Sequence, residues 1–562
     1  MTVLRIGNAS GFYGDRFAAW QEMLTGGELD VLTGDYLAEL TMLILGRDRM
    51  RDPGLGYART FLRQLEGGLS LARERNVRLV SNAGGVNPAG LAEAIRGLAG
   101  RLGIEVRVGW VTGDDLTGRA AELGLGAPLT ANAYLGAWGI AECLRAGADV
   151  VVTGRVTDAS LVVGPAVAHF GWGREDYAAL AGATVAGHVL ECGPQATGGN
   201  FSFFAELPDG GHRPGFPVAE LAADGSSVVT KHPGTGGAVT VETVTAQLLY
   251  ETGDPAYLGP DVVTHLDTVA LTQDGPDRVR VTGARGTPPP PGLKVAVTTL
   301  GGFRNSMTFV LCGLDIEAKA ALVRRQLTEA VGADGLELRL ARTDHAGAAT
   351  TEEASALLHV HVKDSDPKRA GRAFSQAAVE LALASYPGCT LTTPPGDATP
   401  FGVYTPAFVP QGEVAHVAVL PGGARVAVAP PPRTEHPPKT PSAAPGPAAQ
   451  AGRTRQAPIG RVAGARSGDK GGDANLGVWA RSDAGYAWLR GFLTAGRLAE
   501  LLPETAGSEI DRYELPNLRA LNFVLHGLLG AGVAGSTRFD PQAKALGELL
   551  RARVVEIPEE LL

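Results

Sequence analysis

Residues 148–154 read ADVVVTG, a short run rich in β-branched residues that ends in a glycine and leads into a stretch of helical character. Four similar runs precede it, each followed by a glycine or a turn residue and then by a helical stretch. They are TVLRIG (2–7), LDVLT (29–33), VRLVS (77–81) and EVRVGWV (105–111). This alternation is typical of βαβ units, so the sequence predicts an α/β fold with a largely parallel, doubly wound, Rossmann-like sheet.

The helical stretches between these runs carry apolar residues at three- and four-residue spacings. The clearest are residues 57–75 and 91–102. Apolar side chains at that spacing line one side of a helix, so we expect these helices to cover a face of the sheet.

Polar residues and glycines follow the ends of all the predicted strands. Ligands of open parallel sheets bind outside the carboxyl ends of the strands, which makes these residues candidates for a functional site. They are Asn8, Ser10, Asp15, Asp35, Glu39, Asn82, Gly84, Gly85, Asn87, Asp114, Asp115, Arg155 and Asp158. Among them we predict that Asp35 and Asp158 are catalytic and that Arg155 pairs with an anionic substrate.

Structural roles compete with these predictions. Asn87, Asp114 and Asp158 each stand where a helix N-cap is expected. Asp35 and Glu39, four residues apart, are interpreted either as paired acids or as part of a solvated helical face.

The segment SNAGGVNP, residues 81–88, places two glycines between a strand and a helix. This arrangement forms a natural cradle for an anion or a carbonyl group, so Asn82, Gly84, Gly85 and Asn87 are predicted to bind substrate. The segment lacks the GxGxxG spacing, so a dinucleotide-binding fold is not supported.

Two further glycine-rich loops carry candidate residues. GHVLECGPQATGGNFS (187–202) contains His188 and Glu191, and it contributes Gln195, Thr197, Gly198 and Asn200 as binding residues. Its Cys192 is either a nucleophile or a small buried apolar group. KHPGTGG (231–237) contributes Gly234, Thr235 and Gly236 to binding. Its His232 is either a general acid or base oriented by Glu242, or a structural histidine.

The segment ARSGDKGGDANLG, residues 465–477, is read as a binding loop because glycines let the backbone approach a ligand while charged side chains surround it. Its candidate binding residues are Arg466, Ser467, Asp469, Lys470, Asp473 and Asn475. The alternative is a solvated turn with fortuitous charges.

Proline and alanine dominate residues 421–457, which predicts a flexible or polyproline-like linker. It would separate a body of residues 1–420 from a tail of residues 458–562 that has enough apolar residues to fold by itself. A weaker break, near residues 285–292, contains the run TPPPP.

Composition excludes several classes of function. A net charge of −9 without a Lys/Arg run argues against a nucleic-acid partner. Four scattered cysteines, no basic leader and no long apolar run lead us to expect a cytoplasmic protein that does not bind membranes. Neither a P-loop nor a GxSxG elbow is present. The pair His359 and His361 supplies too few ligands for a metal, so neither a metal nor a cofactor is expected.

The longer motifs resemble the acyclic terpene utilisation protein A family. In the body they are SNAGGVNP (81–88), TGRVTDASLVVGP (153–165), ECGPQATGGNF (191–201), HPGTGGAVTVETVTAQLLYE (232–251), GDPAYLGPDV (253–262) and GLDIEAKA (313–320). In the tail, ARSGDKGGDANLGVWAR (465–481), RYELPNLRALNFVL (512–525) and RFDPQAKALGELL (538–550) resemble the ferredoxin-fold domain that commonly follows.

The resemblance implies a role beside biotin-dependent carboxylases in pathways that degrade citronellol- and geraniol-type compounds as coenzyme A thioesters. We expect a lyase or hydratase that acts on an acyl-CoA or a related carboxylate. The alternative is a noncatalytic binding or assembly subunit that associates with acyl-CoA carboxylase components. A homo-oligomer is expected for a protein of this size.

The loop at residues 465–477 either forms a second independent site or docks over the site of the body and completes it. We favour completion, because Arg466 and Lys470 would supply positive charge that the loops of the body mostly lack.

Overall fold

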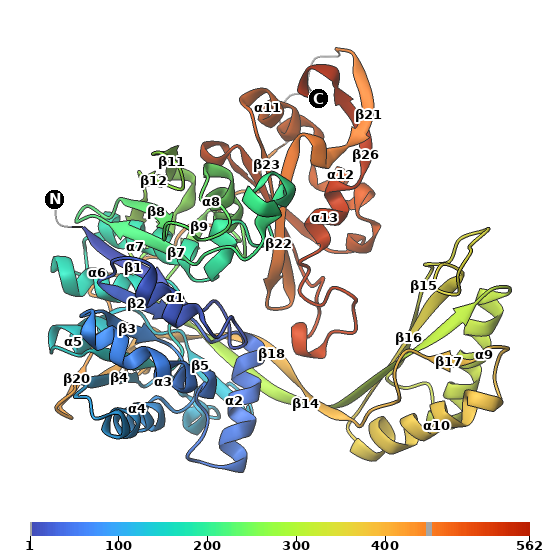
Figure 1. The fold of residues 1–562 in the computed structure, drawn as a ribbon, viewed down its shortest axis with the longest axis horizontal. Helices are drawn as coiled ribbons and strands as arrows, with labels where there is room; N and C mark the ends of the chain where they lie inside the picture. The colour runs from blue at the N-terminus through green and yellow to red at the C-terminus, as the bar shows by residue number, and fades with distance from the viewer. Residues whose placement is uncertain (1–2, 445–451) are drawn as a thin grey trace. The chain divides into compact units, whose positions relative to one another are not determined.

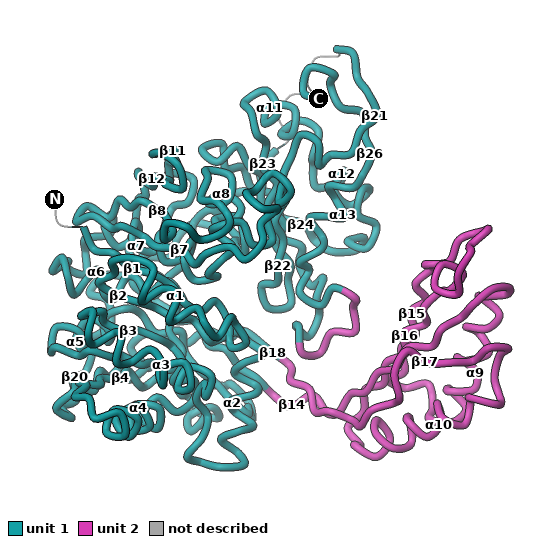
Figure 2. The backbone as a smooth tube through the Cα atoms, viewed as in Figure 1, with its two compact units in different colours: residues 1–298, 404–533, 540–562 teal, residues 299–403, 534–539 magenta. Residues whose placement is uncertain are grey.

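The computed structural model of the chain, drawn in Figure 1, describes residues 3–444 and 452–562. It divides into two compact units (Figure 2). Unit 1 contains the chain up to Thr298, Tyr404–Val533 and Asp540–Leu562, and unit 2 contains Thr299–Val403 and Ala534–Phe539. Thr2 of the first predicted strand and residues 445–451 of the predicted linker lie outside the described residues.

A large mixed sheet forms the centre of unit 1. Within the described residues it has 11 strands in the order β11-β12-β8-β7-β1-β2-β3-β6-β4-β19-β20. The central strands run parallel. They are β1 (Leu4–Asn8), β2 (Val31–Gly34), β3 (Arg78–Ser81), β6 (Val150–Thr153) and β4 (Val108–Thr112). Each of them overlaps one of the predicted runs.

Antiparallel strands extend this parallel centre on both sides. They are β7 (Pro217–Leu221), β8 (Ser227–Lys231), β12 (Val279–Thr282), β11 (Ala270–Gln273), β19 (Val417–Val419) and β20 (Arg425–Ala427). The turn between Leu221 and Ser227 is too short for a parallel crossover, so β7 and β8 form a hairpin. The prediction of a largely parallel sheet therefore holds for the centre only.

Helices cover both faces of the parallel centre, because successive strand residues point to opposite sides. Leu79 packs with Phe61 and Ile95, whereas Val80 packs in the other core with Ile140 and its neighbours. The first core is built by α1 (Ala19–Gly26), α3 (Arg59–Glu74) and α4 (Pro88–Leu102), and the second by α5 (Trp138–Arg145), α6 (Ser160–Phe170) and α7 (Tyr177–Leu190). The helices predicted at 57–75 and 91–102 correspond to α3 and α4.

The remaining elements of the body complete unit 1. A short sheet joins β9 (Ala256–Leu258), β10 (Val263–His265) and β13 (Arg285–Thr287), and β5 (Thr130–Ala133) pairs with the first part of β14 (Gly292–Cys312). Two helices, α2 (Glu39–Arg51) and α8 (Val241–Leu248), flank the candidate site described below. The proline run at 287–291 connects β13 to β14, and the chain enters unit 2 further on, inside β14.

Unit 2 is an antiparallel sheet with helices on one face. Its elements are the second part of β14, β15 (Leu336–Ala341), β16 (Ser355–Asp364), β17 (Thr390–Leu391), part of β18 (Thr399–Pro410), α9 (Ile316–Val331) and α10 (Phe374–Glu380). Leu358 and Val360 of β16 face the helical core. His359 and His361 therefore lie on the opposite face, as the alternation predicts.

The tail is a four-stranded antiparallel sheet with helices on one face, within the described part of the chain. Its strands, in order, are β22 (Ala463–Lys470), β23 (Asp473–Ala480), β25 (Ala520–Leu525) and β24 (Ile510–Leu515). Its helices are α11 (Asp483–Phe492), α12 (Ala495–Leu501) and α13 (Leu546–Arg551), and a small ribbon pairs β21 (Thr454–Pro458) with β26 (Val554–Pro558).

The predicted binding loop at residues 465–477 is a hairpin in the structure. Strands β22 and β23 pair from Ala463 with Ala480 to Lys470 with Asp473, and Gly471 and Gly472 make the turn. The φ of Gly471 is +68°, which a glycine adopts without strain. A two-glycine turn between alternating residues is a hairpin signal, which the charged residues around it obscure.

The described part of the predicted linker contacts both the body and the tail. Its residues 428–444 contain neither helix nor strand. Glu435 N donates to Pro289 O at 2.9 Å, and Thr440 donates through N and Oγ1 to the Asp254 carboxylate at 2.8 and 2.6 Å. On the tail side, Ala443 N donates to Arg512 O at 2.8 Å. We call residues 435–443 the strap.

Candidate functional site

The tail packs on the body through buried asparagines. Asn475 Oδ1 accepts a hydrogen bond from Glu251 N at 2.8 Å, and its Nδ2 donates to Leu249 O at 2.8 Å. Asn522 Nδ2 donates to Thr252 O and Gly253 O at 2.8 and 2.7 Å. These amides satisfy backbone groups that follow the end of α8, so the tail and the body share one buried interface.

Glycines of the hairpin permit this close approach. A Cβ atom on Gly468 would collide with the Tyr250 ring, and one on Gly477 would collide with the Leu249 side chain. On the opposite face of β23, Leu476 and Val478 fill the core of the tail. Gly468 and Gly477 therefore serve packing against the body, where the sequence suggested backbone contacts to a ligand.

Two cations of the hairpin reach into the body. The Arg466 guanidinium lies 4.2 Å from the centre of the Tyr250 ring and donates a hydrogen bond to Gln195 Oε1. Lys470 Nζ donates to the carbonyl oxygen of Glu251 at 2.5 Å and lies 5.4 Å from the centre of the Tyr257 ring. The positive charges of the tail thus meet the end of α8 and the strand β9.

Arg155 and two aspartates form one part of the site. Arg155 Nη1 lies 3.0 Å from Asp158 Oδ1 and donates to Leu37 O at 2.9 Å. Asp35 Oδ1 accepts hydrogen bonds from Asn82 Nδ2 at 2.7 Å and from Leu37 N at 2.9 Å. Burial, followed by the charge of Asp158, raises the pKa of Asp35 well above its usual range. The structure therefore brings together Asp35, Asn82, Arg155 and Asp158.

His188 and Glu191 form a second part. His188 Nδ1 lies 3.0 Å from Glu191 Oε1, and both side chains are almost fully buried. Burial and then Lys470 lower the pKa of His188 to about 4. Burial and then Asp158 raise the pKa of Glu191 well above its usual range. Both shifts favour the uncharged forms, an uncharged imidazole beside a protonated carboxyl group.

Two polar atoms of this pair are buried without a partner in the described part of the chain. His188 Nε2 and Glu191 Oε2 have no hydrogen-bond partner among the described residues. A buried polar atom without a partner calls for an explanation, and a bound molecule supplies one.

Glu251 and Lys470 connect these parts electrostatically. Burial and then Asp469 raise the pKa of Glu251, and burial and then Lys294 lower the pKa of Lys470. Glu191 and Asp158 act on the pKa of Lys470 from the body. We call Asp35, Arg155, Asp158, His188, Glu191, Glu251 and Lys470 the charged cluster. Shifted pKa values of this kind gather at functional sites.

Glu39 and Tyr404 lie at the edge of the charged cluster. Cβ atoms built on Gly471 and Gly532 of the tail would contact both side chains, and Lys294 Nζ lies 5.7 Å from the centre of the Tyr404 ring. Burial and then Asp469 raise the pKa of Glu39 to about 7. Turn residues of the tail thus border acidic and aromatic side chains of the body.

The other predicted catalytic residues lie in different surroundings. The His232 ring packs against Gly26 and Gly27, and its Nε2 is 3.0 Å from Met23 O. Glu242 forms an ion pair with Arg481 at 2.9 Å. The expected pairing of His232 with Glu242 is therefore absent from the described contacts, and His232 fits the structural alternative.

Most glycines of the three body loops serve protein packing. Cβ atoms on Gly84 and Gly85 would strike Thr153 O and Leu45, and one on Gly236 would strike His212 O. Gly198 and Gly234 have φ values of +113° and +76°, which explains glycine at these turns. No part of this geometry requires a bound anion.

The remaining binding candidates make hydrogen bonds within the protein. Asn87 Oδ1 accepts from Gly90 N at 2.9 Å, so Asn87 is the N-cap of α4. Thr197 Oγ1 donates to Pro194 O at 2.9 Å, Thr235 Oγ1 donates to His232 O at 2.7 Å, and Asn200 is exposed. Ser467 Oγ accepts from Gly547 N at 2.9 Å in the tail.

The final two candidates of the hairpin differ in their surroundings. Gln542 Nε2 lies 3.4 Å from Asp469 Oδ1, and burial raises the pKa of Asp469. Asp473 accepts from Gly527 N at 2.8 Å and lies 3.1 Å from His526 Nδ1.

Cys192 is a protonated thiol, because burial and then Glu191 raise its pKa well above the usual range.

Several residues of the site were not predicted as functional. Glu251 and Tyr257 stand in the motifs 232–251 and 253–262, and the position of Glu251 shortly after α8 is an available signal. Tyr134, Lys294 and Tyr404 occupy strands or strand ends, where nothing in the local sequence marks them. The ammonium group of Lys294 meets the rings of Tyr134 and Tyr404 only because strands that are far apart in the sequence pack together.

Comparison with known families places both parts of the chain. The model of the acyclic terpene utilisation family protein AtuA matches residues 4–420, and that of the AtuA ferredoxin-like domain matches residues 457–556. No curated protein matches the chain. Among the described residues, no helix has the length and apolar character needed to cross a membrane.

Proposed function

Because this chain belongs to the acyclic terpene utilisation family of AtuA, a family implicated in the use of acyclic terpenes, we propose that it is a lyase or hydratase that acts on an acyl-CoA or a related carboxylate. The observation that carries the proposal is the charged cluster, in which buried acids of raised pKa and a lysine of lowered pKa act electrostatically on one another. The alternative, a noncatalytic binding or assembly subunit, is decided by the experiment below.

The acids of the charged cluster support two opposite proton transfers. Asp158 is paired with Arg155 at 3.0 Å and serves as the base. Glu191, whose buried carboxyl group has a raised pKa that favours the protonated form, serves as the acid. A proton donor and a proton acceptor at one site are what an addition or elimination across a carbon–carbon double bond requires.

Lys470 and Arg155 supply the positive charge for an acyl substrate. In hydration, Asp158 takes a proton from water while the water oxygen bonds to the β-carbon of an enoyl group. The electron pair of the double bond moves toward the carbonyl oxygen, where Lys470 stabilises the negative charge. Glu191 then donates a proton to the α-carbon, and the product is a 3-hydroxyacyl group. The reverse sequence eliminates water.

A panel of enoyl-CoA and 3-hydroxyacyl-CoA thioesters, followed by mass spectrometry, tests the proposal. The purified protein is expected to add or remove one water, and Glu191→Gln is expected to lower turnover at least 100-fold while substrate binding persists. Glu380→Gln, on the exposed side of α10, is the matched control. Binding of a thioester without any mass change would contradict the enzyme and support the binding subunit.

A further inference from the structure

A pocket opens beside Lys470, where the body, the tail and the strap meet. Its volume is about 390 Å³. The body contributes residues 252–258 in part, the tail contributes β23, β24 and the end of β25, and the strap contributes Pro437, Pro438 and Lys439. A volume of this size is typical of sites for small molecules.

One wall of the pocket is apolar. Leu258, Pro437, Pro438 and Val524 line it, and 52% of the Leu258 surface remains exposed. Large exposed apolar side chains within a concave surface are typical of ligand sites. The wall is therefore suited to an apolar chain.

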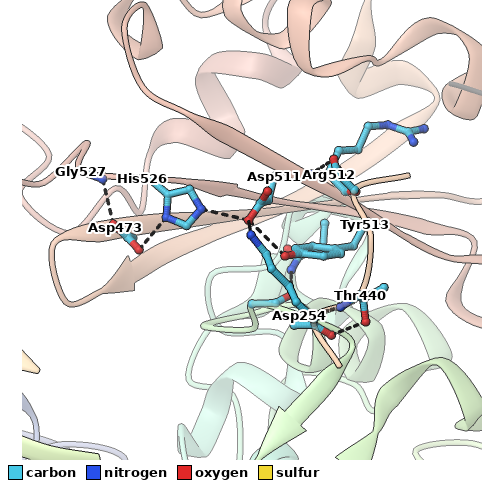
Figure 3. A network of polar contacts seen from close by, with 12 residues as sticks. Asp254, Thr440, Asp473, Asp511, Arg512, Tyr513, His526 and Gly527 are labelled. Atoms are coloured by element: carbon cyan, nitrogen blue, oxygen red, sulfur yellow. Dashed lines mark hydrogen bonds and ion pairs between the residues drawn. The ribbon is translucent and has the colours of Figure 1, made fainter. Parts of the chain in front are cut away.

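The carboxylates of the pocket are already paired within the protein, as Figure 3 shows. His526 lies between Asp473 and Asp511, with each ring nitrogen 3.1 Å from a carboxylate oxygen. Asp511 also forms an ion pair with Lys439 at 2.9 Å. Asp254 accepts two hydrogen bonds from Thr440 of the strap. Asp254 and Asp511 hold the strap, and Lys439 and His526 balance part of the charge of Asp511 and Asp473.

Lys470 remains as a cation with spare capacity. An ammonium group has three donors, and among the described residues Lys470 makes one hydrogen bond, to Glu251 O. Lys470 lines the pocket and is exposed in part, while its ammonium group lies against Glu251 of the charged cluster. An anionic or strongly polarised head group beside the apolar wall would accept hydrogen bonds from the remaining donors of the Lys470 ammonium group.

We propose that this pocket binds the apolar chain of a medium-length carboxylate or of its thioester, with the carboxyl or thioester carbonyl at Lys470. The strap supplies part of the wall, so its proline-rich sequence contributes to ligand selection. The inference rests on the proposed function only for the reacting end of the ligand, since chain binding is measurable without turnover.

Calorimetric titration of the full chain tests the pocket with octanoate, octanoyl-CoA and acetyl-CoA as probes. Octanoyl-CoA is expected to bind at least tenfold more tightly than acetyl-CoA, because each buried methylene contributes about 0.8 kcal/mol. Leu258→Trp and Val524→Trp narrow the pocket and are expected to remove this preference. Leu383→Trp in unit 2, where the native side chain is fully exposed, is the control.

The two sources of ligand give different outcomes. Binding of octanoate that is lost in Lys470→Met assigns a free carboxylate, whereas binding of octanoyl-CoA alone assigns a thioester. Equal affinity for octanoyl-CoA and acetyl-CoA overturns the inference, as does an unchanged preference in both tryptophan variants. Chain-selective binding without turnover contradicts the proposed function and leaves the pocket established.

Discussion

Lys470 Nζ donates a 2.5 Å hydrogen bond to the carbonyl oxygen of Glu251, which joins the turn of the tail hairpin to the residues after α8. Neither the body nor the tail alone contains all residues of the charged cluster. The acids stand on the body, and the lysine whose pKa they affect stands on the tail. Contact between segments more than 200 residues apart in the chain therefore assembles the charged cluster.

Replacement of Asn475 by alanine is expected to weaken the interface of body and tail. The change leaves Leu249 O and Glu251 N without a buried partner, which costs about 2–4 kcal/mol of unfolding free energy. Urea unfolding measures the loss. Gln376→Ala, on the exposed side of α10, removes one exposed hydrogen bond and is expected to change the unfolding free energy by less than about 0.5 kcal/mol. Equal effects of the two changes would contradict the role of Asn475.

Gly477→Ala tests the packing role of the hairpin glycines. The added methyl group collides with Leu249, so we expect a destabilisation of about 1–3 kcal/mol. Gly100→Ala within α4, where nothing lies within 4 Å of the new methyl, is expected to stabilise the protein by about 0.5–1 kcal/mol. Thermal unfolding of both variants compares them, and a neutral Gly477→Ala variant would show that this glycine serves something other than the interface.

Glu39→Gln is expected to change how stability depends on pH. Burial raises the pKa of Glu39 from 4.5 to about 7, so its ionisation lowers the stability of the folded protein as the pH rises across that interval. The variant avoids this loss and is expected to be more stable than the wild type at pH 8 by up to about 3 kcal/mol, with little difference at pH 4.5. Denaturant titrations at the two pH values measure the gap, and an identical gap at both would contradict the assignment.

His526→Gln is expected to be less stable than the wild type, by a difference that shrinks as the pH rises. Burial lowers the pKa of His526, but the hydrogen bonds that the charged ring donates to Asp511 and Asp473 more than offset this effect, so the net shift is upward. The stabilisation by the charged imidazole is complete below pH ~6.5 and is lost as the pH rises through the folded pKa. Since the side chain is 36% exposed, we expect a difference of at most about 1 kcal/mol at pH 5.5 that shrinks at pH 8.5. A difference that grows with pH would contradict this network.

Much of the architecture follows from local sequence signals. The β-branched runs and the amphipathic helices predict the parallel centre, because each needs only its own periodicity to be recognised. The antiparallel strands added from residue 217 onward were not predicted, since strand pairing distant in sequence leaves no local pattern. The sequence predicts a loop at residues 465–477 where the structure has a hairpin, because charged residues and glycines are typical of loops.

The candidate site was only partly predictable for the same reason. Asp35, Arg155, Asp158 and Lys470 stand in recognisable motifs at strand ends or turns. Glu251 is contacted by the tail, and the ammonium group of Lys294 lies over the rings of Tyr134 and Tyr404. Neither contact leaves a pattern in the local sequence. His232 stands in an equally suggestive loop but packs against α1, so composition alone does not separate a catalytic histidine from a structural one.

The central claim is that Lys470 of the tail completes the active site of the body, and steady-state kinetics of Lys470→Met test it most directly. With whichever enoyl-CoA substrate the wild type converts, the variant is expected to lose at least about 100-fold in kcat/KM while its unfolding midpoint stays within a few degrees of the wild type. Lys368→Met, which removes an exposed lysine of unit 2, is expected to retain wild-type kcat/KM. Wild-type kcat/KM in the Lys470→Met variant would contradict the account.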